Sequence, residues 1–386
     1  MRSSPDGEQL AFVHQPVGTR FEIIILDRSN TPHVVLTFPR EPGYPRSLAW
    51  TPDGKRLRFT TFDRSGTRLS SVSLRGDVRS LYRFPGAMLL EDISPDGTMI
   101  ISIVDSSRHI ALMRPGQRSH RELGWLGTPG IVDLSQDGRA LLFVDGEVWG
   151  FEQNAVLGAT DGTPPKVLGP GVPIALSPDG RRVAMTSRDQ HGLVLVPTGA
   201  GTTEEVLVEG LVLNIGQWSR DGRRLWIEAR RNDNARVQLF PVDVATRKLL
   251  EPIAGSDIIP YPAIAISPDD RWIAAAGADR VLTVYPVNKG EPIRISSLQS
   301  DLSPFPAGWT STGELWVGLP GATPPRVVRV EFPTGKITRS IDIDLREIGG
   351  DYMTDSRITP DESLLAIEYE IWQGRLELMK GIPPDR

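Results

Sequence analysis

The chain has 386 residues, and its formal net charge of −5 gives it no excess of the basic residues that nucleic-acid binding needs. It contains no cysteine, which excludes disulfides, thiolate catalysis and cysteine-based zinc sites. No apolar run reaches the roughly 18 residues of a membrane span, and residues 1–7 contain no signal-peptide apolar core.

A four-residue turn motif, Ser-Pro-Asp-Gly, first occurs at residues 4–7 and returns, intact or altered, along the whole chain. Proline favours the φ angle of a type I turn, aspartate can accept backbone N–H groups, and glycine accepts a positive φ. The motif recurs about every 44 residues, a period typical of the four-stranded blades of a β-propeller. Its third position is occupied by Asp6, Asp53, Asp96, Asp137, Asp179, Asp221, Asp269, Thr312 and Asp361.

Apolar or alternating runs precede and follow each motif, so each motif is expected to be the corner between the first two strands of a blade. In the second repeat the four expected strands are 46–50, 57–63, 68–74 and 78–84. The first repeat starts too close to residue 1 for an innermost strand, and the last repeat supplies three strands and lacks its outermost one. The sequence therefore predicts one all-β domain over 1–386, a β-propeller of eight to nine four-stranded blades with incomplete blades at both termini.

The Ser-Pro-Asp-Gly corner, the apolar strand after it, a polar turn with Asp or Arg, and a third strand rich in Leu and Val resemble the WD-repeat-like propeller of the TolB family. They also resemble the propellers of the dipeptidyl peptidase IV and prolyl oligopeptidase families. The resemblance covers essentially the whole chain and implies a fold rather than a function.

Residues 357–381 are similar to the closing blade of propellers at the C-terminal end of bacterial eukaryotic-like serine/threonine kinases, although Glu362 replaces the glycine of the motif. This resemblance implies a sensory or scaffolding domain in the periplasm or another extracytoplasmic compartment. It also implies fusion or tethering to an upstream kinase or signalling domain.

Catalytic motifs of the related enzymes are missing from the sequence. It has no G-x-S-x-G nucleophile elbow, no G-x-G-x-x-G loop and no D-F-G triplet. His109 and His191 both fall in predicted turns between second and third strands, where the similar propeller of oligogalacturonate lyases uses histidines around a metal. Two polar turn residues are the simpler interpretation, because the five histidines are scattered along the chain. We expect no cofactor and no metal.

Charged residues recur in the predicted turns between second and third strands, which propeller geometry brings to one rim. Loops on a rigid scaffold often carry binding groups, but solvated turns and ion pairs between blades explain the same pattern. An aromatic ring in a connection can be a binding anchor, or it can pack in the core. The candidate binding residues are Asp63, Arg64, Asp105, Arg108, His109, Arg188, Asp189, His191, Arg231, Asp233, Asp279, Arg280 and Trp372.

The sequence predicts a non-catalytic, monomeric interaction or sensory module that binds a protein, peptide or glycan at one rim of the channel. The alternative is a metal-assisted polysaccharide lyase or hydrolase at the channel mouth, which requires His109 and His191 to converge. The corners are expected to serve the fold, and the binding site is expected at the opposite rim.

Overall fold

The computed structural model describes residues 1–14, 20–39, 44–63, 66–117, 119–123, 129–146, 153–187, 192–206, 208, 210–231, 236–259, 263–298 and 302–382. All regular secondary structure in these ranges is β, in seven four-stranded antiparallel sheets and one five-stranded sheet. The prediction of an all-β, multi-blade propeller is confirmed. The described residues contain no helix that is long and apolar enough to cross a membrane.

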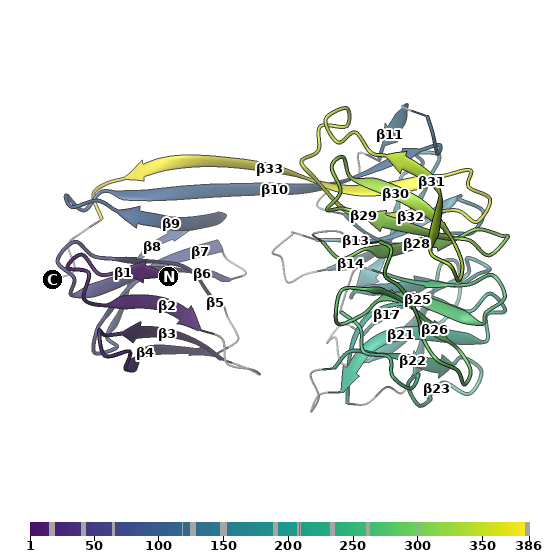
Figure 1. Cartoon of the computed structure of the whole chain (residues 1–386), viewed down its shortest axis with the longest axis horizontal. Coiled ribbons are helices and arrows are strands. Elements are labelled where there is room, and N and C mark those ends of the chain that lie inside the picture. The colour runs from purple at the N-terminus through teal and green to yellow at the C-terminus, as the bar shows by residue number, and fades with distance from the viewer. Residues whose placement is uncertain are drawn as a thin grey trace. The chain divides into compact units, whose positions relative to one another are not determined.

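The chain divides into two compact units. Unit 1 comprises Met1–Ser106 and Trp372–Arg386, and unit 2 comprises Ser107–Ile371. Two long strands that pair with each other, β10 (Met99–Met113) and β33 (Leu365–Met379), contribute to both units (Figure 1). The periodic motif predicts one continuous domain. It gives no sign of the division into two units, because blades of both units carry the same corner motif.

Five blades of unit 2 each consist of four consecutive strands. These strands are β12 (Gly130–Leu134), β13 (Ala140–Asp145), β14 (Asn154–Ala159) and β15 (Lys166–Pro170); β16 (Pro173–Leu176), β17 (Arg182–Thr186), β18 (Leu193–Pro197) and β19 (Glu204–Val206); β20 (Leu211–Trp218), β21 (Arg224–Arg231), β22 (Gln238–Asp243) and β23 (Lys248–Leu249); β24 (Ile264–Ile266), β25 (Trp272–Ala276), β26 (Leu282–Pro286) and β27 (Ile293–Ile295); β28 (Phe305–Trp309), β29 (Leu315–Leu319), β30 (Arg326–Glu331) and β31 (Lys336–Asp342).

The sixth blade of unit 2 combines strands from distant parts of the sequence in the order β32 (Tyr352–Ile358), β33, β10 and β11 (His120–Glu122). The sequence predicted that the last repeat of the chain lacks its outermost strand, and in this blade the outer two positions are taken by β10 and β11 from an earlier part of the chain. The innermost strands β12, β16, β20, β24, β28 and β32 contact one another in a closed ring. In the described part of the chain, unit 2 is therefore a closed six-bladed propeller.

Unit 1 contains two four-stranded sheets and a third sheet made of β9 (Ala87–Ile93) with β10 and β33. The sequence predicted that the first blade lacks an innermost strand, but the two-residue β1 pairs with β2 in that position. The strands of the first two sheets are β1 (Arg2–Ser3), β2 (Leu10–His14), β3 (Arg20–Leu26) and β4 (Pro32–Pro39); β5 (Tyr44–Trp50), β6 (Arg56–Asp63), β7 (Gly66–Ser73) and β8 (Val78–Phe84).

The corner motif folds as its residue types predict. In the corner 177–180, the Gly180 N–H donates to Ser177 O at 2.8 Å, and Gly180 has a φ of 68°. Asp179 Oδ1 accepts from Ser177 Oγ at 2.7 Å and from the Arg181 N–H at 3.1 Å. These bonds fix the direction in which the second strand leaves the first, so each corner sets the geometry of its blade.

Candidate functional site

Five of the predicted rim residues lie outside the described residues, so their role stays a prediction. They are Arg64, Arg188, Asp189, His191 and Asp233. The alternative function, which requires His109 and His191 to converge on a metal, likewise stays a hypothesis, because His191 lies outside the described residues.

Four other candidates do not lie in turns. Asp105, Arg108 and His109 are in the middle of β10, and Trp372 is in β33. Their polar neighbours suggested turns between strands, but pairing of β10 with β33 carries both strands straight through these positions. Trp372 is 52% exposed.

The remaining candidates are engaged within their own blades. In unit 1, Asp63 at the end of β6 lies 3.9 Å from Arg68 and 3.7 Å from Arg83. In unit 2, Asp279 forms an ion pair of 2.6 Å with Arg294, and the Arg231 guanidinium lies over the Phe240 ring. Arg280 is an exposed turn residue with a φ of 65°. These contacts lie within single blades, whereas the alternative interpretation of the rim charges named ion pairs between blades and solvated turns.

His109 packs within the sixth blade. Its Nδ1 lies 2.7 Å from Glu122 Oε1, its Nε2 lies 2.9 Å from Ser107 Oγ, and its ring stacks on Tyr369. Both ring nitrogens thus have neighbours on the same blade. These contacts orient the imidazole along the sheet that it belongs to.

Buried charges gather where the sixth blade meets the first blade of unit 2. Arg357 on β32 donates through Nη1 to Asp355 Oδ1 and to Ser356 O, and through Nη2 to Val132 O of β12 at 3.3 Å. Glu368 on β33 accepts from the Ile131 N–H of β12 at 2.5 Å. The channel cluster, as we name it, comprises the half-buried Arg108 and the buried Asp133, Asp355, Arg357, Glu368 and Glu370.

Burial dominates the electrostatics of the channel cluster. It raises the pKa of Asp133 to about 6 and that of Asp355 to about 7, even though Arg357 lowers both. Burial also raises the pKa of Glu368, against the effect of Arg108. Burial opposes a rise in the pKa of Arg108, but Glu368 and Glu370, the latter at 2.9 Å, more than offset it. Asp133 and Asp355 can therefore gain or lose a proton near neutral pH.

Two residues of the channel cluster are distinguished in the sequence by their position in the repeats. Asp133 and Arg357 are the last but one residues of their innermost strands. In three other blades of unit 2 that position holds a small residue, Ala175, Ala265 or Gly308. A charged residue at a strand position that holds alanine or glycine in other blades indicates that the side chain has a different environment there.

The corner side of the channel also carries polar groups. Gln136 and Arg220 replace the proline of two corners, and the Arg220 guanidinium donates to Gln136 Oε1 at 3.1 Å. Together with Asp133, Gln217 and other residues, they line a cavity of about 60 Å³. The corners, which were expected to serve only the fold, thus also contribute residues to the lining of a cavity.

A larger groove of about 890 Å³ lies beside β31 and β32 of unit 2. Its lining includes the proline-rich turn 320–325, the connection 342–348 and, from β10 and β32, Met113 and Tyr352. Four carboxylates and one cation line it, namely Asp342, Asp344, Glu347 and Asp351 with Arg346. We call this feature the acidic groove.

The acidic groove has an apolar floor and adjoins the channel cluster. Met113 and Ile348 pack against a core cluster that includes the buried Ile343 and Leu345. Tyr352 is 36% exposed, and burial, followed by the charge of Glu370, raises the pKa of its phenol. Acidic edges over an apolar floor can hold an extended chain that carries both apolar and positively charged groups.

The closed ring of four-stranded antiparallel blades defines unit 2 as a β-propeller. No protein-family model matches the chain, and no curated protein matches it.

Among solved structures, the chain is similar to TolB from Acinetobacter baumannii (17% identity, 74% of this chain and 65% of that one, TM-score 0.34). It is similar to a putative TolB from Agrobacterium tumefaciens (17% identity, 92% and 99%, TM-score 0.37). A luciferin-regenerating enzyme is also similar (13% identity, 62% and 89%, TM-score 0.44). The chain spans about two thirds of the length of the first of these proteins.

Proposed function

We propose that this protein is a non-catalytic binding module that holds an extended, positively charged segment of a partner protein in the acidic groove. The observation that carries this proposal is the combination of four carboxylates with an apolar floor in one groove of about 890 Å³. The proposal requires no catalytic residue. It places the partner beside β31 and β32 instead of in the predicted ring of turns.

Two properties of the groove favour a peptide segment. Its volume lies in the range of roughly 300–1,000 Å³ of ligand sites, and it is lined along two connections and two strand ends. Asp344 and Glu347 are exposed, so they can meet basic side chains without losing much hydration. Contacts with the apolar floor then provide affinity, and the carboxylates select a positively charged segment.

The test uses a short fluorescein-labelled peptide of alternating lysine and valine, with a glutamate–valine peptide as its charge-reversed counterpart. Fluorescence anisotropy with the full chain should detect binding of the lysine peptide alone. The double change Asp344→Lys and Glu347→Lys should weaken this binding by about tenfold or more, which corresponds to about 1.4 kcal/mol.

A matched control reverses two exposed glutamates of unit 2 outside the groove, Glu251→Lys and Glu291→Lys. This control has the same net charge as the groove variant and should keep most of the affinity. Equal weakening in both variants would mean general attraction to an acidic protein, and no binding by the unaltered chain would refute the proposal for this class of segment.

A further inference from the structure

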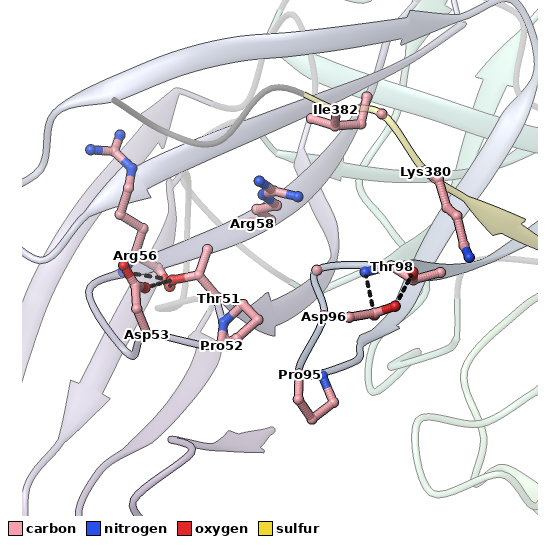
Figure 2. Close-up of a pocket in the computed structure, with 12 residues that line it drawn as sticks. Thr51, Pro52, Asp53, Arg56, Arg58, Pro95, Asp96, Thr98, Lys380 and Ile382 are labelled. Carbon is pink, nitrogen blue, oxygen red and sulfur yellow. Dashed lines mark hydrogen bonds between the residues drawn. The ribbon is translucent and has the colours of Figure 1, made fainter.

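Two successive residues of the second strand of each repeat point to the sheets on either side of it. The first of them pairs with the last residue of the innermost strand and points to the preceding sheet. Leu57 of the second sheet of unit 1 does so in the buried cluster that it shares with Ala11 of the first sheet. The second residue points to the following sheet. Arg58, for example, lies between the corners of the second and third sheets (Figure 2), and its Nη1 lies 3.4 Å from Met99 Sδ.

The position that points to the preceding sheet is covered completely in eight repeats. Its residues there are all 0% exposed, namely Leu57, Met99, Leu141, Val183, Leu225, Ile273, Leu315 and Leu365. In the first sheet of unit 1 the same position holds Leu10, which is only half-buried. The first sheet therefore leaves open a face that a preceding sheet covers in the other repeats.

The position that points to the following sheet shows the same contrast at the other end of unit 1. In eight repeats its residues are at most 6% exposed, namely Ala11, Arg58, Leu142, Ala184, Trp226, Ala274, Trp316 and Ala366. In the third sheet of unit 1 this position holds Ile100, which is only half-buried. The third sheet therefore leaves open the face that a following sheet covers elsewhere.

The open face of the first sheet is apolar. Ala11, Ile23 and Ile25 point to the second sheet, so the residues that alternate with them in β2 and β3 point away from it. Val34 of β4 pairs with Ile24 and is 54% exposed. The first-sheet face, as we name it, comprises Leu10, Phe12, Ile24, Leu26 and Val34.

The open face of the third sheet is apolar as well. Met99 and Ile101 of β10 and Met379 of β33 pack in a cluster with buried residues of the second sheet, so their neighbours in the strand point away from it. Among these neighbours, Leu376 and Leu378 of β33 are 72% and 69% exposed. The third-sheet face, as we name it, comprises Leu89, Ile100, Val104, Leu376 and Leu378.

The two open faces are of opposite kinds, and they lie at the two ends of a stack of three sheets. In the described part of unit 1, the second sheet contacts the first and the third, and no sheet covers the outer sides of these two. Six sheets of the same repeat close the ring of unit 2. A second copy of unit 1 supplies three more sheets and presents both kinds of face.

We propose that two copies of this chain join through unit 1, with the third-sheet face of each copy packed on the first-sheet face of the other. A two-fold axis then makes the two contacts equivalent, and six sheets close a ring. A cavity of about 530 Å³ lined by Arg2, Leu48 and Leu90 of the three innermost strands becomes part of its channel. This dimer differs from the monomer that the sequence predicted, and it is independent of the acidic groove in unit 2.

Sedimentation velocity of the full chain should show a dimer with a Kd below about 10 μM. The double change Leu376→Glu and Leu378→Glu should raise this Kd by at least about tenfold, because it places two charges in an apolar contact. The change Val34→Lys on the other face should raise it by at least about threefold. All three side chains are exposed within one copy, so both variants should fold, and circular dichroism checks this.

An equimolar mixture of the two variants tests the pairing of unlike faces. A mixed dimer keeps one unaltered contact, and at its other contact the lysine lies on the face opposite the glutamates, so the mixture should dimerise more tightly than either variant alone. The matched control is Leu74→Glu with Val78→Glu, two exposed apolar residues beside the turn between β7 and β8 of the second sheet. It should dimerise as the unaltered chain does.

Three results would overturn the proposal. The first is an unaltered chain that stays monomeric at about 50 μM. The second is a dimer that neither the Leu376→Glu, Leu378→Glu variant nor the Val34→Lys variant weakens. The third is a mixture of these two variants that associates no better than each of them alone, because a contact between like faces would behave in that way.

Discussion

Asp355 is a carboxyl group buried inside unit 2, where a guanidinium and another carboxylate both lie close to it. Arg357 attracts a negative charge on Asp355, and Glu368 repels it. Loss of hydration, together with the repulsion by Glu368, outweighs the attraction and hydrogen bond of Arg357 and the hydrogen bond of the Ser356 N–H, and it raises the pKa of Asp355 from 3.8 to about 7. The folded protein therefore keeps a proton on Asp355 at pH values where the unfolded chain has lost it.

This proton makes the stability of unit 2 depend on pH. A raised carboxyl pKa contributes stability that is full below the unfolded value of 3.8 and is lost as pH rises to the folded value of about 7. One bound proton gives a slope of about 1.4 kcal/mol per pH unit. Asp133, with a pKa of about 6, adds a second decrease of the free energy of unfolding with rising pH, and this decrease ends at a lower pH.

We expect Asp355→Asn to remove the upper part of this dependence. Between about pH 6 and pH 7 the free energy of unfolding should still fall in the unaltered chain, and it should be nearly constant in the variant. Chemical denaturation at a series of pH values measures both profiles. Parallel profiles across this range would show that Asp355 is already ionised in the folded state.

Sequence reasoning could reach only part of the site at the scale of single residues. Arg108 was singled out for its charge, but its partners Glu368 and Glu370 lie some 260 residues away along the chain. The pKa values of Asp133 and Asp355 depend on burial, which the local pattern of a strand does not reveal. Only the substitution of small residues by charges at equivalent positions was visible in advance.

At the scale of elements, a corner that departs from the Ser-Pro-Asp-Gly motif can lose a favoured backbone conformation and gain contacts between blades. Glu362 occupies the glycine position with a φ of 59°, a left-handed conformation that a side chain disfavours. Its carboxylate lies 2.7 Å from Arg329 Nη1 and 3.0 Å from Arg339 Nη1 of the neighbouring blade. The side chain thus joins two blades, where glycine would only close a turn.

Two changes at this position separate backbone strain from the ion pairs. Glu362→Gly should remove the ion pairs and relieve the strain, whereas Glu362→Ala should remove the pairs and keep the strain. We expect alanine to be less stable than glycine by about 1 kcal/mol. Thermal or denaturant unfolding measures the difference, and equal stability would show that the corner tolerates the left-handed conformation without cost.

The corners and most strands could be predicted because their signals are local. The predicted strand 57–63 corresponds to β6, and the bonds of the corner 177–180 follow from its residue types. β10 and β33 could not be predicted as single long strands, because their pairing joins segments from opposite ends of the chain. Polar residues at 105–109 and 373–374 suggested turns that this pairing overrides.

At the scale of the whole molecule, closure of unit 2 depends on strands that are distant in sequence. Its sixth blade takes β32 and part of β33 from late in the chain, and part of β10 with β11 from early in the chain. The ring of innermost strands closes between β32 and β12. The channel cluster lies at this same junction, where Arg357 and Glu368 bond to backbone atoms of β12.

We predict that residues 107–371 fold without the remainder of the chain, because they contain six complete blades and the closed ring. The purified fragment should show a β-type circular dichroism spectrum and one cooperative thermal transition.

A shorter fragment, 129–371, lacks β11 and the remaining part of β10, so the outer edge of β33 loses its partners and Arg108 no longer accompanies Glu368 and Glu370. That fragment should melt at a markedly lower temperature or aggregate through its open edge. Equal stability of the two fragments would mean that the two inner strands of the sixth blade and the five complete blades suffice for closure. A disordered longer fragment would mean that unit 2 requires unit 1 to fold.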